Sequence, residues 1–368
     1  MQKILILGIG SAQQDAIEYC KDRGMEVIGC SCSGGRGTGL LDAFEDTDIK
    51  DIDGVTGIAE KHRVDVIYSV GSDIAMPAVM KASEILGLPH FVSYETALKC
   101  HRKDLMRDFL GRSFRGNLKC KIYTCMDDAL RHEDFPSMMK PVDSQGQRGC
   151  YRVNSADDIK AHFGETLGFS GAGRVIIEEY VSGPEISASV YVCDGKIEAF
   201  FFSDRATYEE YPGGIIKEHR LPSTIAEAER EAAVDLIRRT VAALGIENGP
   251  CYIQIKLRNG SEPVLIEMSP RLDGCHLWKL IKTYCGIDLL DLTFRHLTGE
   301  NVFFQIPSAD ICTSCSLEFI MKEPGTRFYR IGANAGKDDY IHYYYDDGDM
   351  VVRKNGHLEK CGYIIHRS

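Results

Sequence analysis

The first hundred residues alternate short apolar runs with amphipathic segments. Residues 3–7 form a continuous apolar run, residues 12–23 repeat apolar positions with helical spacing, and residues 25–30 are apolar again. Another apolar run covers residues 64–70. Apolar runs linked by amphipathic helices are typical of buried parallel strands. The pattern therefore predicts a βαβ unit within a parallel-sheet domain, for which we expect the boundaries 1–98.

A different pattern, alternation of apolar and polar residues, predicts antiparallel strands later in the chain. Residues 252–257 alternate, Arg258–Ser261 places Asn-Gly at the centre of a turn, and residues 263–268 return as a mostly apolar strand. Asn-Gly between two such runs is a strong hairpin signal. Gln254 and Glu267 should therefore lie on neighbouring strands.

Further antiparallel strands are predicted on either side of this hairpin. Residues 185–192 and 196–202 read as strands joined at Asp194-Gly195, and residues 225–244 read as a helix. From Asn301 onward the chain is rich in aromatic strands, which predicts a small β-rich domain over 301–368, a closing or dimerising element. Turn signals in that part lie at Asp346–Asp349 and Lys354–Gly356.

Composition and charge exclude several classes of partner. The 368 residues carry a formal net charge of -11, which disfavours nucleic acid or an anionic membrane as partner because either prefers a basic face. The chain has no run of 18 apolar residues and no charged-then-apolar leader, so we expect a cytoplasmic protein. Its 14 cysteines are scattered, so we expect reduced thiols. Cys312–Cys315 is the only C-x-x-C, and without a second ligand pair it is weak support for zinc or redox chemistry.

Glycines in the first forty residues suggest phosphate or dinucleotide loops, but neither signature is complete. After Gly8 and Gly10, the third glycine of a dinucleotide motif is replaced by Gln13, and no acidic residue closes the second strand. The glycine-rich stretch 33–39 lacks the G-K-[ST] ending of a phosphate loop, so it predicts a mobile connection.

Candidate nucleotide chemistry begins at Lys140. A short apolar strand ends on this lysine and opens into the loop Ser144–Gly149, which brings an ammonium and bare backbone N–H groups to a polyphosphate. Downstream, residues 175–185 form an apolar strand that runs into acidic residues and a Ser-Gly-Pro turn, as a hinge beside a nucleoside would. Ser269, with Arg271 two residues later, follows the second hairpin strand. Such oxygen and guanidinium groups suit magnesium and phosphate.

Three motifs in this order, MKPVDSQGQRG, IIEEYVSGPE and IEMSPR, resemble the ATP-grasp superfamily, most closely the branch that looks like the carbamoyl phosphate synthetase large subunit and biotin carboxylase. The resemblance covers roughly residues 1–300. It implies an α/β fold with α+β lobes: a parallel-sheet, Rossmann-like pre-ATP-grasp domain followed by a two-lobed ATP-grasp domain over 99–300. The glycine turn near the N-terminus would then face the second substrate.

The resemblance also implies roles for single residues. Lys140 would contact the α/β-phosphates, Ser144–Gly149 would close over the β/γ-phosphates, and Arg271 would steady the transferred phosphoryl group. The implied ATP-binding residues are Lys103, Lys140, Ser144, Gly146, Gly149, Glu178, Glu179, Val181 and Glu185, of which Glu178, Glu179 and Val181 would line the adenine pocket. The implied ligands of Mg²⁺, with Mn²⁺ as an alternative, are Gln254, Glu267 and Ser269. The family usually has Asn where this chain has Ser269, which leaves one metal site open.

Substrate contacts are expected from four further residues, each with a structural alternative. Asp73 follows a predicted strand, where open parallel sheets bind ligands, but it could instead be the N-cap of a helix. Arg205 is a candidate carboxylate or phosphate clamp or a surface arginine. Asp273 and His276 come a few residues after the second hairpin strand and are candidates to face the substrate. The alternative for His276 is a structural role, since a lone histidine is often structural. For the basic residue that begins the nucleotide-facing helix, we choose Lys103 over Arg102.

The activity implied by the resemblance is a two-step ligation. A substrate carboxylate attacks the γ-phosphate of ATP to give an acylphosphate and ADP, and an amine then displaces phosphate. Expected partners are therefore small-molecule carboxylates and amines, and a homodimer is one expected assembly. One alternative is a small-molecule kinase of the same fold, which would need no amine. Another is a nucleotide-binding regulator without turnover.

Overall fold

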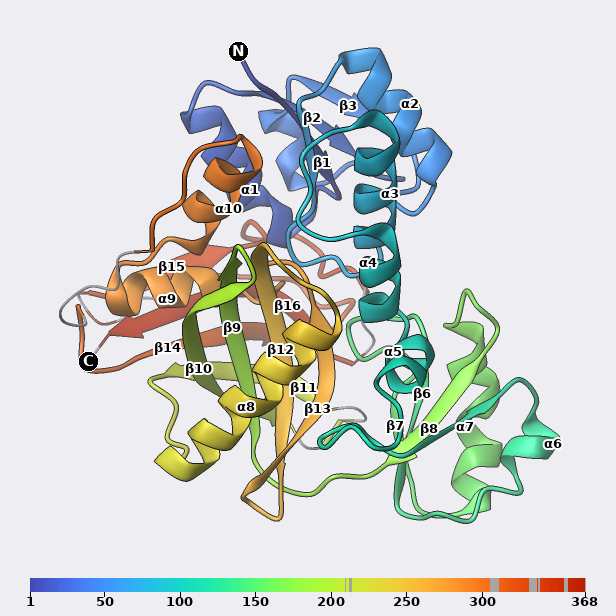
Figure 1. Ribbon diagram of the computed structural model, residues 1–368. Coiled ribbons are helices and arrows are strands. Elements are labelled where there is room, and N and C mark those ends of the chain that lie inside the picture. The colour runs from blue at the N-terminus through green and yellow to red at the C-terminus, as the bar shows by residue number, and fades with distance from the viewer. Residues whose placement is uncertain are drawn as a thin grey trace.

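The computed structural model describes residues 1–208, 210–211, 214–304, 311–330, 336, 338–353 and 357–367, with the backbone alone at Arg36. Within these ranges the named strands form three sheets (Figure 1). One belongs to the N-terminal region at the top of the view and one forms a small lobe at the lower right. The third and largest lies at the lower left, below the N-terminal sheet, and includes the C-terminal strands. The predicted α/β fold with a parallel-sheet region and two lobes is confirmed.

The N-terminal sheet is parallel, with the strand order β3-β2-β1-β4. Its apolar strands are almost completely buried because helices pack on them, as the continuous apolar runs predicted. The elements are β1 Lys3–Leu7, α1 Ser11–Asp22, β2 Glu26–Cys30, η1 Arg36–Leu40, β3 Ala43–Glu45, α2 Ile52–His62, β4 Val66–Tyr68 and α3 Met76–Leu86.

The structure decides the N-cap alternative for Asp73 and shows how the glycine-rich stretch 33–39 packs. Asp73 is not a helix N-cap: α3 begins at Met76, and its N-cap is Ala75, which provides no side-chain cap. The glycine-rich stretch contains the 3₁₀ helix η1, and a Cβ on Gly35 would lie only 2.7 Å from the carbonyl oxygen of Ile9. Glycine is thus required there by close packing, while the mobility predicted for the stretch stays a prediction.

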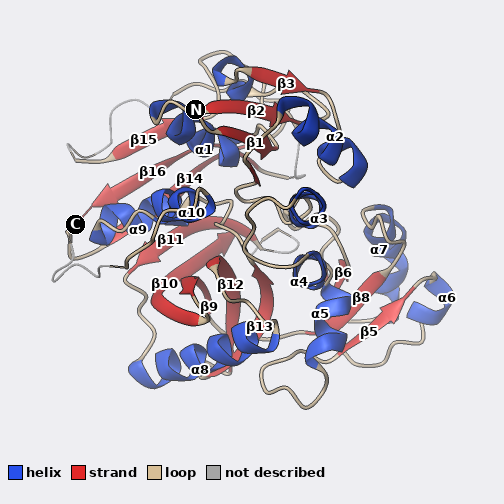
Figure 2. Ribbon diagram, turned by 45° about the horizontal axis from the view of Figure 1, so that its top comes forward, coloured by secondary structure: helices blue, strands red, loops and turns tan. Residues whose placement is uncertain are grey.

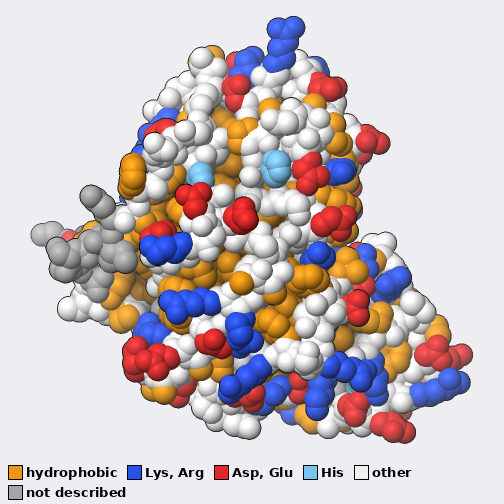
Figure 3. All heavy atoms as spheres, in the orientation of Figure 1, with side chains coloured by type: hydrophobic (Ala, Val, Ile, Leu, Met, Phe, Trp, Pro, Cys, Tyr) orange, Lys and Arg blue, Asp and Glu red, His pale blue; other side chains and the backbone are white. Residues whose placement is uncertain are grey.

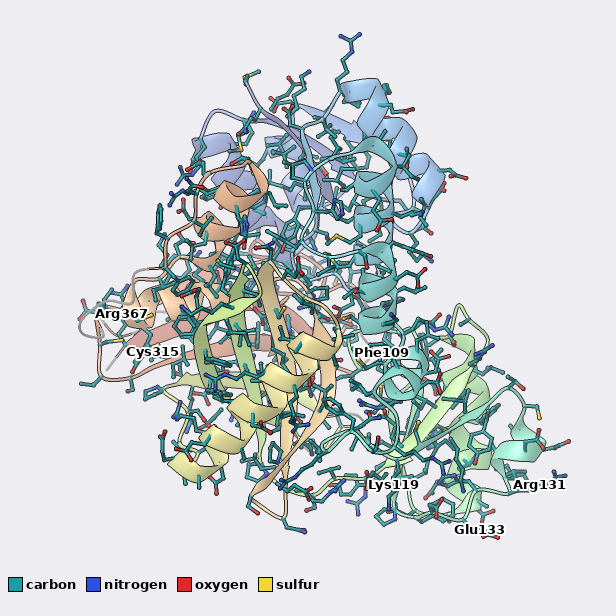
Figure 4. The ribbon with its side chains drawn as sticks, in the orientation of Figure 1. Phe109, Lys119, Arg131, Glu133, Cys315 and Arg367 are labelled. Carbon is teal, nitrogen blue, oxygen red and sulfur yellow. The ribbon has the colours of Figure 1, made fainter. Side chains whose placement is uncertain are left out.

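Two helices connect the N-terminal sheet to the small lobe. They are α4 Tyr94–His101 and α5 Lys103–Leu110, and they continue downward from α3 in Figure 1. Ser93 caps α4 by accepting a hydrogen bond from the Thr96 N–H. In Figure 2, α3 and α4 are seen nearly end-on between the large sheet and the small lobe. In Figure 4, Phe109 of α5 also lies between the large sheet and the small lobe.

The small lobe is an antiparallel sheet in the order β5-β8-β6-β7 with a separate core. Met139 and Ile177 point into that core and pack with Phe163 of α7. Its elements are β5 Cys120–Tyr123, α6 Met126–Ala129, β6 Ser137–Pro141, β7 Tyr151–Val153, α7 Ala156–Gly168 and β8 Val175–Glu179. Arg131 and Glu133 mark the outer end of this lobe in Figure 4. Because the lobe has its own core, it can open relative to the rest of the chain.

The large sheet has the strand order β13-β12-β9-β10-β11-β14-β16-β15, and α8 lies across it in Figure 1. Both predicted hairpins are present, and Asp194, Gly195, Asn259 and Gly260 all have positive φ. Asp194-Gly195 is a two-residue turn, which requires positive φ at both positions, whereas the second hairpin has the three-residue loop 259–261. The elements are β9 Glu185–Cys193, β10 Lys196–Tyr208, β11 Ile215–Leu221, α8 Glu227–Ala243, β12 Gly249–Arg258, β13 Glu262–Ser269, α9 Leu277–Cys285, α10 Leu289–Leu297, β14 Cys315–Lys322, β15 Tyr340–Tyr343 and β16 Glu359–Arg367.

The C-terminal strands extend the large sheet, because β14 pairs with β11. Leu317 and Tyr363 belong to the same buried core as the N-terminal strands. The predicted turn at Asp346–Asp349 is present, with the Asp349 N–H donating to the Asp346 carbonyl at 3.1 Å. The turn predicted at Lys354–Gly356 lies outside the described residues. The boundaries 1–98, 99–300 and 301–368 stay a prediction.

The surface seen in Figure 3 mixes basic and acidic side chains with apolar ones between them. No helix in the described ranges combines the length and the apolar character needed to cross a bilayer.

Candidate active site

The β12–β13 hairpin brings the predicted metal ligands together. Gln254 lies directly opposite Glu267, and Tyr252 lies opposite Ser269, so the prediction that Gln254 and Glu267 occupy neighbouring strands is confirmed. Side chains in such pairs are about 5 Å apart at Cβ and point to the same face. The register shifts immediately after Gln254, and bulges of this kind are frequent beside active sites because they re-aim side chains.

The donor atoms at this point fit a hard cation. Glu267 is half-buried, and its carboxylate makes no hydrogen bond or ion pair with any described residue. Gln254 donates through Nε2 to the Glu185 carboxylate, which orients the amide and leaves its oxygen free. Oxygen ligands from a carboxylate and an amide are those that Mg²⁺ prefers.

Across the site, Lys140 projects from the small lobe. The burial of β6 alternates, so Met139 faces the lobe core while Lys140 faces the opposite side. Lys140 Nζ lies 2.9 Å from Glu178 Oε2, and Arg107 Nε of α5 lies 2.7 Å from Glu178 Oε1. Arg107 also donates to the Ile266 carbonyl of β13 at 2.7 Å. Arg107 therefore links α5, the small lobe and the β12–β13 hairpin.

Burial and charge act in opposite directions on this triad. Burial raises the pKa of Glu178, but Arg107 and Lys140 outweigh it and bring the pKa to about 2. Burial likewise opposes the charged form of Lys140, but the Glu178 carboxylate raises the pKa of the lysine above its ordinary value. Both groups are therefore ionised at neutral pH, and the phosphate contact of Lys140 stays a prediction.

The loop Ser144–Gly149, called the glycine loop below, contacts elements on both sides of the site. Lys103 donates from its backbone to the Val142 carbonyl at 2.9 Å and from Nζ to the Ser144 carbonyl at 3.0 Å. Gln145 accepts from the Asp73 N–H at 3.1 Å, and Gln147 donates to the Gly214 carbonyl. The loop is thus held between the N-terminal region and the β10–β11 connection.

The two predicted loop glycines are required by backbone conformation. Gly146 and Gly149 have φ of +69° and +66°, in the left-handed region. A Cβ on Gly149 would also lie 2.9 Å from Phe169 and 3.2 Å from Thr166. Substitution at Gly149 would therefore push the loop away from α7.

Asp73 from the N-terminal region is paired with Arg271. Arg271 donates from Nε and Nη2 to the two Asp73 oxygens at 2.9 and 2.6 Å, and Ser269 donates to Asp73 Oδ1. Burial raises the pKa of Asp73, but Arg271 outweighs it and lowers the pKa below its ordinary value. Ser269 thus uses its hydroxyl hydrogen on Asp73, while its oxygen keeps lone pairs.

Residues 270–276 connect β13 to α9 and are called the exit loop below. Close backbone packing joins the N-terminal sheet to this loop. The Gly71 N–H donates to the Leu272 carbonyl at 3.1 Å, and a Cβ on Gly71 would lie 2.5 Å from the Gly274 Cα. Gly71 also has φ of +69°. Glycine at both positions allows Asp73 to reach Arg271.

A small pocket lies where these elements meet, with a volume of about 20 Å³. It has room for about one water or a metal ion. Its walls come from the N-terminal region, α4, α5, the glycine loop and β13, and its lining residues are Asp73, Cys100, His101, Lys103, Ser144, Glu267 and Ser269.

The predicted hinge residues lie around the end of β8. Glu179 accepts from the Lys119 N–H at 3.0 Å and pairs with Arg258 at 2.9 Å. The Val181 carbonyl accepts from Lys256 Nζ at 3.4 Å. The adenine-lining roles of Glu178, Glu179 and Val181 stay predictions.

Two other predicted substrate residues lie on the large sheet and the exit loop. Arg205 is buried and forms an ion pair with Glu185, which also accepts from Gln254, so the three side chains form one chain of contacts. Asp273 is 3% exposed, and burial raises its pKa. Their substrate roles stay predictions.

Both ring nitrogens of His276 have protein partners. Nδ1 lies 2.8 Å from Asp15 of α1, Nε2 lies 2.6 Å from the Tyr344 hydroxyl, and the ring stacks on Tyr363. His276 therefore ties together the N-terminal region, the exit loop and the C-terminal strands. These contacts favour its structural alternative.

Sequence reasoning missed Arg107 and His101. Arg107 lies in the basic segment from which Lys103 was chosen, four residues after it, and therefore on the same helical face. That spacing was the available signal. Nothing in the pattern around His101 distinguishes it from a surface histidine.

Residues 133–278 match the family model described as the ATP-grasp domain. This range includes Lys140, the glycine loop, the β12–β13 hairpin and Arg271. The chain contains an ATP-grasp domain. The resemblance predicted from the three motifs is therefore confirmed.

Two curated relatives are similar at low identity. An uncharacterised protein of Sinorhizobium fredii is 25% identical over 240 residues, which cover 63% of this chain and 48% of that protein. The formate-dependent phosphoribosylglycinamide formyltransferase of Bacteroides thetaiotaomicron is 24% identical over 280 residues, or 74% of this chain and 71% of that enzyme. The ATP-grasp chain thus spans about half of the first relative and somewhat more of the second.

Solved structures share the fold over the whole chain. An L-amino acid ligase from Bacillus licheniformis has a TM-score of 0.82 at 17% identity, covering 100% of this chain and 94% of that one. The biotin carboxylase domain of the Hydrogenobacter thermophilus 2-oxoglutarate carboxylase, in complex with MgADP, ADP and bicarbonate, has a TM-score of 0.80 at 14% identity, covering 100% and 86%.

Proposed function

We propose that this ATP-grasp protein is an ADP-forming ligase that activates a substrate carboxylate as an acylphosphate and joins it to an amine. The observation that carries the proposal is the position of Gln254 and Glu267, opposite each other on paired strands, with Arg271 at the strand exit. Relatives whose names denote ligation of amino acids support it, among them the L-amino acid ligase and a D-alanine–D-alanine ligase of Desulforudis audaxviator.

In this proposal the chain itself provides charge and alignment. Lys140 and Lys103 neutralise phosphate oxygens, and Arg271, once released from Asp73, grips the phosphoryl group in transfer with its planar fork. Mg²⁺, with Mn²⁺ as an alternative, would be held by Gln254 and Glu267 and would neutralise further phosphate charge. Phosphoryl transfer depends on such positioning and electrostatics more than on a protein nucleophile.

The glycine loop gives the site its barrier to water. Closed between Asp73 and Gly214, it covers the phosphate end, which protects a reactive acylphosphate from hydrolysis. Opening of the small lobe would admit ATP, and closing would bring Lys140 to the hairpin. The cytoplasmic location, the small-molecule partners and a homodimer belong to the same proposal.

The test is release of ADP and phosphate from Mg-ATP in the presence of pools of carboxylates and amines. Release should require one member of each pool and should be abolished in Glu267→Gln. A matched control is Glu262→Gln on the same strand, whose side chain is 40% exposed and lies 3.4 Å from Arg258.

The alternatives give different outcomes in the same assay. ADP formed with a carboxylate or hydroxyl compound alone, with the phosphate retained on that compound, would identify a kinase. ATP binding without turnover in every pool would identify a regulator. Equal loss of activity in Glu262→Gln and Glu267→Gln would contradict the role of the hairpin as a metal site.

A further inference from the structure

A second group of metal-ligating side chains lies near the exit loop, apart from Gln254 and Glu267. One ligand atom each of His219, Asp273 and Cys275 lies within 4.8 Å of the other two. His219 comes from β11, and the other two come from the loop between β13 and α9. His219 is fully buried, Asp273 is 3% exposed and Cys275 is half-buried. Two segments far apart in sequence therefore place nitrogen, oxygen and sulfur donors together.

The His219 ring has a free nitrogen in this group. Nδ1 lies 3.1 Å from the Ser203 hydroxyl, whereas Nε2 is buried with no hydrogen-bond partner among the described residues. A buried unpaired nitrogen costs about 1–3 kcal/mol, so few are retained without a use. Metal-bound histidines characteristically hydrogen-bond through their other ring nitrogen, which fixes the ring orientation. Ser203 is placed to do this.

The other two side chains are also oriented for a ligand. Asp273 accepts the Cys275 N–H at 2.9 Å through one oxygen and the Leu277 N–H at 2.7 Å through the other, so each oxygen is fixed and keeps a lone pair. Lys360 Nζ lies 3.2 Å from Cys275 Sγ. This contact fixes the position of the sulfur beside the other two donors.

Nearby charges set the conditions for a cation. Arg205, the cross-strand partner of His219, forms an ion pair with Glu185 and is thereby largely neutralised. The Asp273 carboxylate and a Cys275 thiolate together would offset the two positive charges of a divalent ion. Zinc lies about 2.0–2.3 Å from its ligands, so the three atoms must approach by about an ångström on binding, within the reach of side-chain torsions.

We propose that His219, Asp273 and Cys275 bind a zinc ion, separate from the Mg²⁺ site of Gln254 and Glu267. The mixed nitrogen, oxygen and sulfur donors select a borderline-soft ion over Mg²⁺, which prefers oxygen ligands alone. Three protein ligands leave a fourth position open, as in sites where zinc contacts water or substrate. The proposal goes beyond the ligase function and does not depend on it.

The experiment measures metal binding by the whole chain without ATP or Mg²⁺. Protein stripped with a chelator and desalted is titrated with Zn²⁺, and with Co²⁺, whose absorption reports thiolate ligation. We expect one equivalent of bound metal and a cobalt–thiolate band. Cys275→Ser and His219→Gln should each weaken binding at least about 100-fold, because loss of a ligand costs no less than loss of its supporting hydrogen bond.

Cys312→Ser is the matched control because it removes a thiol from the single C-x-x-C and leaves the proposed site intact. Circular dichroism establishes whether each variant is folded. If the Cys275 variant does not fold, alkylation of the wild type decides: zinc should slow modification of Cys275 but not of exposed Cys125. No retained metal, metal lost in Cys312→Ser but kept in Cys275→Ser, or unprotected Cys275 would overturn the proposal.

Discussion

Replacing Glu178 with glutamine should destabilise the small lobe strongly at neutral pH. The substitution keeps the side-chain shape but removes the only negative charge in contact with Lys140 and Arg107 among the described residues. The Glu178 side chain is completely buried, so water cannot screen the change. A carboxyl pKa brought from 4.5 to about 2 corresponds to about 3 kcal/mol of stability at neutral pH. Loss of one partner from a buried ion pair costs roughly 3–5 kcal/mol, in agreement.

The pH dependence has a defined sign. Because the pKa of Glu178 is lowered on folding, its stabilising contribution is complete above pH 4.5 and is lost as the pH falls towards 2. The stability difference between the wild type and Glu178→Gln should therefore be constant from pH 7 to about 5.5. It should shrink by about 1 kcal/mol by pH 3.5.

The assay must follow the small lobe because that lobe has its own core and can unfold separately. Amide hydrogen exchange of peptides from β6 and β8, read by mass spectrometry, measures its local opening at each pH. Glu179→Gln is the matched control: the neighbouring residue pairs with Arg258 while 28% exposed, and surface pairs contribute about 0–1 kcal/mol. Equal effects of the two variants at pH 7, or a Glu178→Gln difference unchanged between pH 7 and 3.5, would refute the reasoning.

Three further outcomes are expected. Asp73→Asn should destabilise the chain by roughly 3 kcal/mol in urea unfolding, because Arg271 remains buried without its counter-ion. Ser269→Asn should lower the Mg²⁺ concentration needed for half-maximal ADP release, since an amide oxygen reaches further than a hydroxyl; an unchanged Mg²⁺ requirement would count against Ser269 as a ligand position. His276→Phe should lower stability by roughly 2–4 kcal/mol, because buried Asp15 loses its partner at 2.8 Å and keeps only Lys279 at 3.6 Å, with the KM values unchanged; a raised KM at unchanged stability would support the substrate role.

Local signals in the chain were sufficient for the elements and for the neighbouring strands of the hairpin. Asn259-Gly260 signals a chain reversal, which brings Gln254 and Glu267 onto neighbouring strands. The exact pairing of Gln254 with Glu267 depends in addition on a three-residue loop, 259–261, and on the register shift after Gln254, which the signal does not contain. The same reasoning located the Asp194-Gly195 hairpin. Each depends on residues close in sequence, where geometry leaves few alternatives.

Contacts between distant segments could not be read in this way. Asp73 and Arg271 are 198 residues apart, and Asp15 and His276 are 261 apart, so their pairing depends on how the N-terminal sheet packs against the exit loop. Asp73 therefore suited a helix cap or a substrate contact equally well by pattern. The structure pairs it with the Arg271 guanidinium instead of placing it at a helix N-cap, and its substrate role stays a prediction. Sheet order in the C-terminal part is equally non-local, since β14 pairs with β11 although five elements, α8 to α10, lie between them in the sequence.

The two neighbouring acids of β8 show where the limit lies. Alternation in a strand predicts that Glu178 and Glu179 point to opposite faces, and they do: one is completely buried and the other is 28% exposed. Nothing in the residues themselves says which face is buried. That is decided by β6, which pairs beside β8 so that Lys140 lies diagonally from Glu178, and by α5, which places Arg107 on the same face. A carboxylate can be buried there because two cations from separate segments meet it, and the same carboxylate holds both side chains in place and raises the pKa of Lys140.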